Sequence, residues 1–389
     1  MNFLQQAQQL EDFLLQTRRD IHMHPELSGR EERTSKRVRD FLRGEGIEVL
    51  PVQAGTSVAA LIRGGRPGRT AALRADMDAL PIEEASELPY RSTEPGVMHA
   101  CGHDVHVTCL MGAARMLQAH ADELQGNVLL LFQAAEEINQ GARTMVEAGV
   151  LDSGVDALFA LHTNTTLEAG QVAFLPGPAQ ASADMFHITI HGRGGHGAFP
   201  HTAVDPVAIG AQLVVQLQSV VARNVDPIDT GVISVCEFHA GSSCNVIPET
   251  AELSGTIRAL APSVRSLIRE RMDALCAGVE RGFDCRCTLE WESGCPAIVN
   301  DPDLTVCAQR ACSGILGPEC VRPIAPAMVG DDMAFFLELV PGVLGALGVR
   351  NEAAGIVYGN HNPRFAVDER CLTVGAACMA QMAWDYLNS

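Results

Sequence analysis

Apolar positions near the N-terminus recur with the period of a helix. Residues 4–14 place apolar side chains at helical intervals. A second amphipathic pattern covers residues 31–42, and Gly44 and Gly46 follow it where a helix would end. The chain is therefore expected to begin with two helical segments.

The pattern then changes to short apolar runs that alternate with helical periods. Runs at residues 71–75, 127–133 and 156–161 predict buried strands, whereas residues 105–118 and 142–148 have helical spacing. Strands that alternate with helices are typical of a mainly parallel sheet with helices on both faces. The first part of the chain is thus predicted to be an α/β domain.

A Pro- and Gly-rich stretch at residues 175–184 interrupts this alternation, and a different order of elements follows it. That order is βαββαβ, which predicts a small ferredoxin-like α+β domain. Near residue 295 helical and short strand patterns resume, and a last helix is expected at residues 369–387. We therefore predict an inserted domain, residues 183–293, within an α/β domain made of residues 1–182 and 294–389. The inserted elements are expected at residues 185–191 (strand), 206–222 (helix), 232–238 (strand), 251–259 (strand), 264–281 (helix) and 285–291 (strand).

Composition narrows the possible partners and compartment. Asp and Glu number 47 against 28 Lys and Arg, and the formal charge of −19 argues against binding to nucleic acid or to an anionic membrane surface. The 13 cysteines are irregularly spaced and are interpreted as mostly reduced thiols. The first twenty residues contain no apolar core of a signal peptide, so a cytoplasmic location is expected.

Residues 99–106 hold three histidines, one cysteine and one aspartate directly before a predicted helix. Thiolate and imidazole are ligands that zinc and similar divalent ions prefer, and the Cys-x-His spacing of Cys101 and His103 lets both side chains reach one ion. Gly102 between them allows a tight turn. The alternative is a buried thiol beside polar groups that cap the helix.

Further candidate ligands follow two of the predicted strands. Glu136 and Glu137 come after the strand at residues 127–133, and His162 ends the strand at residues 156–161. Ligands of open α/β sheets bind at the carboxyl ends of strands, so these side chains are expected near Cys101. One of the two glutamates can bind metal while the other acts as a general base. The alternative for the glutamate pair is a solvated helix start.

Two further positions complete the candidate site. His361 lies in a loop rich in Gly, Asn and Pro, where a lone histidine would carry little meaning. Asp76 and Asp78 follow the strand at residues 71–75, where a carboxylate can orient a histidine ligand through its second ring nitrogen. We assign this orienting role to Asp78.

These motifs together resemble the metal-dependent aminoacylase and carboxypeptidase superfamily, in particular its hippurate hydrolase and indole-acetyl-amino-acid hydrolase branch. The resemblance runs nearly end to end and rests on the stretches RRDIHMHPELS, LRADMDALP, MHACGHDVH, FQAAEE, LH, GRGGHGAFPH, NVIPETAELSGTIR, DDMAFFLE and GNHNPRF. It implies two divalent ions, zinc, manganese or cobalt, with Glu136 as the catalytic base. The ligands implied are Cys101, His103, Glu137, His162 and His361.

The resemblance also implies that the inserted domain is a lid that forms a dimer. His196 then stabilises the oxyanion, while Asn245 and Arg258 bind the carboxylate of an N-acyl amino acid substrate. In some relatives the lid histidine comes from a neighbouring subunit. The implied reaction releases a carboxylic acid and an amino acid. A dipeptidase or carboxypeptidase, and a catalytically silent metal-binding protein, are the alternatives.

Three positions depart from the pattern of the branch. Ala134 replaces a frequent proline, Asp331 a frequent glutamate and Ala366 a frequent aspartate, and none of them is a proposed ligand. The stretch at residues 192–197 formally matches a dinucleotide-binding fingerprint, but Pro200 and Pro206 follow where a helix should begin at once. Nucleotide binding is therefore not expected.

Overall fold

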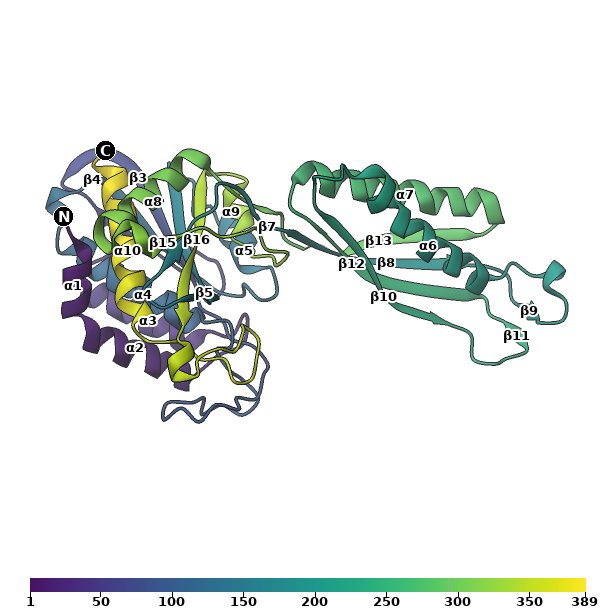
Figure 1. The fold of residues 1–389 in the computed structure, drawn as a ribbon, viewed down its shortest axis with the longest axis horizontal. Coiled ribbons are helices and arrows are strands. Elements are labelled where there is room, and N and C mark those ends of the chain that lie inside the picture. The colour runs from purple at the N-terminus through teal and green to yellow at the C-terminus, as the bar shows by residue number, and fades with distance from the viewer. Residues whose placement is uncertain (293) are drawn as a thin grey trace. The chain divides into compact units, whose positions relative to one another are not determined.

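The computed structural model describes residues 1–292 and 294–389, and the chain divides into two compact units (Figure 1). The chain passes between the units within strands β7 (Gly177–Gln180) and β14 (Ile298–Asn300), and again on either side of residues 326–330. Unit 1 consists of Met1–Gly177, Val299–Ala325 and Asp331–Ser389. Unit 2 consists of Pro178–Ile298 and Pro326–Gly330.

Unit 1 is built on an eight-stranded sheet with the order β1-β2-β4-β3-β5-β16-β6-β15. The central strands β4, β3, β5 and β16 are parallel, whereas β1, β2 and β6 join through antiparallel pairs. The predicted α/β class is confirmed: the sheet is mixed, its central strands are parallel and antiparallel pairs lie toward its edges. Its strands are β1 (Glu48–Val49), β2 (Val58–Arg63), β3 (Arg66–Asp76), β4 (Gln125–Gln133), β5 (Ala157–Glu168), β6 (Val172–Ala173), β15 (Val321–Arg322) and β16 (Gly342–Arg350).

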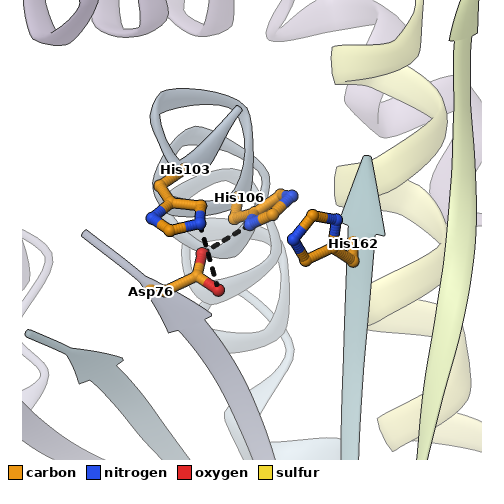
Figure 2. Close-up of side chains that lie close together, drawn as sticks. All are labelled: Asp76, His103, His106 and His162. Atoms are coloured by element: carbon orange, nitrogen blue, oxygen red, sulfur yellow. Dashed lines mark hydrogen bonds and ion pairs between the residues drawn. The ribbon is translucent and has the colours of Figure 1, made fainter. Parts of the chain in front are cut away.

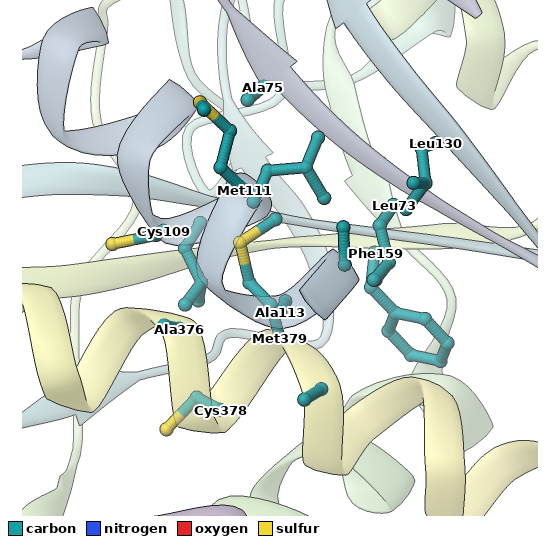
Figure 3. Packing of buried hydrophobic residues seen from close by; sticks show 14 of the residues in the cluster. Leu73, Ala75, Cys109, Met111, Ala113, Leu130, Phe159, Ala376, Cys378 and Met379 are labelled. Carbon is teal, nitrogen blue, oxygen red and sulfur yellow. The ribbon is translucent and has the colours of Figure 1, made fainter. Parts of the chain in front are cut away.

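Helices cover both faces of the central strands. On one face α4 and α10 contact β3, and the strand residues Leu73, Leu130 and Phe159 lie beside side chains of these two helices (Figure 3). Burying such large apolar side chains stabilises the fold by about 1.5–3 kcal/mol each. Neighbouring residues of a strand point to opposite faces, so Arg74 faces away from this core, towards the side where α5 contacts β4. The helices of unit 1 are α1 (Phe3–Gln9), α2 (Glu11–Met23), α3 (Glu32–Gly44), α4 (His103–Gln118), α5 (Gly141–Glu147), α8 (Pro302–Leu316), α9 (Ala334–Leu337) and α10 (Cys371–Leu387).

Unit 2 has the predicted βαββαβ order. Its four strands form an antiparallel sheet with the order β10-β12-β8-β13, and α6 and α7 contact each other and the sheet. This is the strand order of a ferredoxin-like fold, with its own apolar core between the helices and the sheet. The elements are β8 (Ser182–His191), β9 (Gly195–His196), α6 (Pro206–Asn224), β10 (Gly231–Ala240), β11 (Val246–Ile247), β12 (Thr250–Ala259), α7 (Pro262–Phe283) and β13 (Arg286–Glu292).

Strands β9 and β11 form a separate two-stranded ribbon. The ribbon follows β8 and precedes β12 in the chain, and Figure 1 shows it beyond one end of the four-stranded sheet. The stretch that formally matches the dinucleotide fingerprint thus leads into β9, and the next α-helix begins only at Pro206. Among the residues that the structure describes, no helix combines the length and apolar character needed to cross a bilayer.

Candidate metal centre

Three parallel strands bring the candidate side chains to one edge of the sheet in unit 1. Asp76 ends β3, Glu136 and Glu137 follow β4, and His162 lies within β5. Because these strands are parallel neighbours, their carboxyl-terminal halves meet at the same edge. The start of α4 adds His103 to this group, and Gly102 precedes it as the N-cap residue.

Gly102 is required at the turn between the two candidate ligands that flank it. Its φ of +90° lies in the left-handed region, which favours glycine, and an added Cβ atom would lie only 2.7 Å from the side chain of Thr163. The Thr163 hydroxyl donates a hydrogen bond of 2.7 Å to the Cys101 carbonyl. The turn therefore holds Cys101 and His103 against β5.

The five predicted ligands form one connected cluster. Cys101 Sγ lies 3.5 Å from His162 Nε2, and ligand atoms of Cys101, His103 and Glu137 lie within 4.8 Å of one another. Glu137 Oε1 is 3.8 Å from His103 Nε2 and 3.6 Å from His361 Nε2. These separations join sulfur, nitrogen and oxygen donors from four segments of the chain.

Hydrogen bonds to the other ring nitrogens orient the histidines. His103 Nδ1 donates to Asp78 Oδ1 at 3.1 Å, and His162 Nδ1 donates to the Thr163 carbonyl at 2.9 Å. In the neutral form of each ring, Nε2 then carries the lone pair on the side of the cluster, as binding of a metal ion requires. Asp78 Oδ2 also accepts from the Glu137 main-chain N–H at 3.0 Å, so Asp78 contacts two of the predicted ligands.

Two buried atoms without hydrogen-bond partners indicate whether these residues fit a metal ion. His103 Nε2 and Glu137 Oε1 are both buried, and neither has a hydrogen-bond partner. Leaving a buried polar atom unpaired costs about 1–3 kcal/mol, so two such atoms 3.8 Å apart call for a common partner. A cation satisfies both, and the mixed donor set suits zinc, manganese or cobalt. The residues therefore fit a divalent ion.

A second cluster, made of Asp76, His103, His106 and His162, also brings ligand atoms within 4.8 Å of one another (Figure 2). His106 cannot serve as a ligand in this arrangement. Its Nε2 accepts a hydrogen bond of 2.9 Å from the Thr163 N–H, and its Nδ1 donates to Asp76 Oδ1 at 2.5 Å. Both ring nitrogens are therefore in use, and His106 instead links Asp76 to the strand that carries His162.

Glu136 and Glu137 differ in their electrostatic surroundings. Burial, together with the nearby Asp331 and Asp332 carboxylates, raises the pKa of Glu136 well above its ordinary value. Burial also acts on Glu137, but its contacts with His361 and His103 outweigh that effect and lower the pKa of its carboxyl. Glu136 thus has the environment of a group that accepts and returns a proton, and Glu137 that of a permanent anion.

Sequence reasoning missed a buried arginine beside these carboxylates. Arg74 forms ion pairs with Asp76 at 2.7 Å and with Asp331 and Asp332 at 3.2 Å each. The shorter side chain at position 331 thus contacts Arg74. Arg74 lies within the apolar run of β3 and had no clear local signal, because only Asp76 is near it in sequence and its other two carboxylate partners are more than 250 residues away.

The predicted substrate-binding residues all lie in unit 2. His196 of β9 pairs with Val246 of β11, and the Gly197 N–H donates to the Asn245 carbonyl at 2.9 Å. His196 and Asn245 therefore share the ribbon. Arg258 lies elsewhere, because it is opposite Ala183 near the other end of β12.

The chain matches one family model and several known proteins. The model of peptidase family M20/M25/M40 matches residues 72–385. Thermostable carboxypeptidase 2 of Saccharolobus solfataricus is 41% identical over 386 residues, covering 98% of this chain and 97% of that protein. N-acetylcysteine deacetylase of Bacillus subtilis is 39% identical and covers 95% of this chain and 96% of its own.

One similar protein of known structure is described as binding two metal ions. The YXEP protein of Bacillus subtilis, a dinuclear metal binding peptidase from the M20 family, superposes with a TM-score of 0.85 at 35% identity. The superposition covers 98% of this chain and 99% of the other. The similarity therefore spans both units of the chain.

Proposed function

Because the chain belongs to peptidase family M20/M25/M40, we propose that this metal-dependent amidohydrolase cleaves the amide bond of N-acyl amino acids. Its products are a carboxylic acid and a free amino acid. The observation that carries the proposal is that two buried atoms, His103 Nε2 and Glu137 Oε1, have no hydrogen-bond partner and lie near the buried carboxyl of Glu136. A cation partner and a proton acceptor are the two parts that amide hydrolysis requires.

Two divalent ions would be held by one mixed set of ligands. The set is Cys101, His103, Glu137, His162 and His361, with Asp78 orienting His103. Ions bound there would polarise the substrate carbonyl and lower the pKa of water. The sulfur, nitrogen and oxygen donors are compatible with zinc, manganese or cobalt.

Glu136 supplies the acid–base chemistry. Its carboxylate takes a proton from water while the water oxygen bonds to the carbonyl carbon of the substrate. It then returns that proton to the amide nitrogen as the carbon–nitrogen bond breaks. Burial favours this role, because a raised pKa brings the carboxyl closer to the pH at which it must gain and lose a proton.

The residues of unit 2 would bind the substrate. We assign His196 to the developing oxyanion, and Asn245 and Arg258 to the carboxylate of the amino acid. Arg258 lies eight residues along β12 from Thr250, which is opposite the last residue of β8, directly before the ribbon. At about 3.3 Å per residue this separation is roughly 26 Å, longer than an N-acyl amino acid.

Arg258 and the ribbon of one chain are therefore too far apart to bind the same small substrate. This separation supports a homodimer in which the ribbon at each site comes from the second copy. Strand β10 is an edge of its sheet and can pair with another strand. The exposed residues of α6 next to it include Val207, Ala211 and Val215, and Arg223 is the only charged residue in that helix. This surface is suited to a second copy of the chain.

A release assay tests the function. Free amine is measured from N-acyl amino acids and from dipeptides, before and after metal chelation and with metal added back. We expect turnover of N-acyl amino acids that is lost with the metal and regained with it. Preferred release from peptides, the activity named for the carboxypeptidase relative, would replace our substrate class. No release from any substrate by the metal-loaded protein would favour a silent metal-binding protein.

A further inference from the structure

One buried guanidinium, next to the candidate metal centre, pairs with three carboxylates. The Arg74 side chain is 2% exposed, and its Nη1 donates to Asp76 Oδ2 at 2.7 Å. Its Nη2 lies 3.2 Å from both Asp331 Oδ1 and Asp332 Oδ1. A planar guanidinium presents five donors in a fixed fork, so it can bind several carboxylates at defined angles. Lysine, a single point charge, cannot reproduce this geometry.

Asp332 is the partner that connects this guanidinium with Glu136. Besides Arg74, Gln133 Nε2 donates to Asp332 Oδ1 at 2.6 Å and the Ala142 N–H donates to Oδ2 at 3.0 Å. These donors come from β4 and from the first turn of α5, and together they fix the Asp332 side chain. The main-chain N–H of the same residue donates to Glu136 Oε1 at 3.3 Å.

We propose that Arg74 is a positioning residue for Glu136, acting through Asp332. The proposal rests on the proposed role of Glu136 as general base. A general base must be held within hydrogen-bond reach of its proton, and small misplacements of reacting groups are costly. Arg74 fixes the segment whose N–H holds the Glu136 carboxylate. Arg74 also places a positive charge against Asp331 and Asp332, the two carboxylates that lie beside Glu136.

A further metal ion is the competing explanation for these carboxylates. Oxygen atoms of Glu136, Asp331 and Asp332 lie within 4.8 Å of one another, a separation that a cation could bridge. The Arg74 guanidinium already contacts both aspartates and supplies the positive charge. Gln133 and the Ala142 N–H also donate to Asp332. Both of its carboxylate oxygens therefore have donors without a metal ion.

The main test is the variant Arg74→Lys, which keeps the charge and removes the fork. We expect kcat to fall about 10- to 100-fold, as for a base displaced by a fraction of an ångström to one ångström. KM should stay within about threefold, because Arg74 does not contact the substrate. Bound metal, measured by elemental analysis, should be unchanged. Loss of metal together with activity would overturn the proposal. It would mean that Arg74 acts on the candidate ligands through Asp76, which contacts His106 as well as Arg74.

A double-mutant cycle separates positioning from a general structural role. In the Glu136→Gln background, Arg74→Lys should lower kcat no further, because the group that it positions is already gone. An additional fall of the same size as in the wild-type background would overturn the proposal. The control is Arg115→Lys, which alters an ion pair with Glu45 in the same unit and shares no partner with the cluster. We expect wild-type kcat from this control.

A crystal structure of Arg74→Lys gives a readout that does not depend on activity. We expect the Asp332 N–H and Glu136 Oε1 to separate beyond 3.5 Å, from 3.3 Å here. An unmoved Glu136 carboxylate would overturn the positioning role. If the wild-type protein hydrolysed no amide, the proposed function would fail, while this structure would still decide whether Arg74 positions Glu136.

Discussion

Glu136 and Glu137 are neighbours in sequence with opposite surroundings. Glu136 lies beside Asp331 and Asp332, which raise its pKa further than burial alone, whereas Glu137 faces His103 and His361. Ala135, directly before them, has a φ of +54°, a conformation that is rare for a residue with a side chain. This strained turn places two consecutive carboxylates in different surroundings.

Substituting each glutamate by glutamine tests this division. We expect Glu136→Gln to lower kcat by ~10²- to 10⁴-fold with bound metal retained. Glu137→Gln should instead release metal, because a neutral amide replaces an anionic ligand next to the unpaired His103 Nε2. Activity and metal content are measured on the same samples. Unchanged turnover in Glu136→Gln would contradict the base assignment, and full metal content in Glu137→Gln would contradict the ligand assignment.

Local chemistry could indicate some residues of the candidate site and not others. Cys101 and His103 stand out because ligand types are dense around them. Arg74 and His106 could not be assigned in this way, because their roles depend on partners such as Asp332 and Thr163 that are distant in sequence. The sequence marked Asp331 only as an aspartate at a position where the resembling branch has a glutamate. Its contact with Arg74 depends on the fold.

The turn at the start of α4 lies between two candidate ligands, Cys101 and His103. Gly102 adopts a left-handed φ and approaches Thr163 too closely for a side chain, while ligand atoms of the candidate ligands on either side of it lie within the cluster. We expect Gly102→Ala to destabilise the protein by about 1–3 kcal/mol and to weaken metal binding. Thermal unfolding with and without metal measures both effects.

Gly314 provides the matched control for this prediction. It lies within α8 of the same unit, and an added Cβ atom would have nothing within 4 Å. Gly314→Ala should therefore stabilise the protein by about 0.5–1 kcal/mol, because alanine favours a helix. Equal effects of the two substitutions, or undiminished metal affinity in Gly102→Ala, would contradict the proposed importance of the turn.

Strand β16 illustrates an element that sequence patterns could not specify. It contains Gly342, Gly345 and Gly348, and glycine is depleted in strands. At each of these positions an added Cβ atom would come within about 2.5 Å of a neighbouring segment, such as the Phe174 ring at Gly345. The glycines are needed for close packing against distant residues. By contrast, the βαββαβ elements of unit 2 were predictable because each has a clear period of its own.

At the scale of the whole molecule, the resemblance indicated a dimer that depends on unit 2. We expect the wild-type protein to be a dimer by light scattering. Val215→Glu places a charge on the uncharged face of α6, where Val215 is 71% exposed, and should produce monomers. Val306→Glu is the matched control, because Val306 is 61% exposed on α8 of unit 1. A wild-type monomer, or dimers of Val215→Glu, would contradict this interface.

The separation of Arg258 from the ribbon along β12 can be tested by combining two mutant alleles. Because the ribbon and Arg258 lie at opposite ends of that strand, each site of the proposed dimer would need residues from two chains, and defects in His196 and in Glu136 would then affect the contributions of different chains. Co-expressing Glu136→Gln and His196→Ala should then let the two alleles complement each other. Random pairing of subunits would restore about a quarter of wild-type activity. Two alleles that stay inactive together would mean that each chain completes its own site.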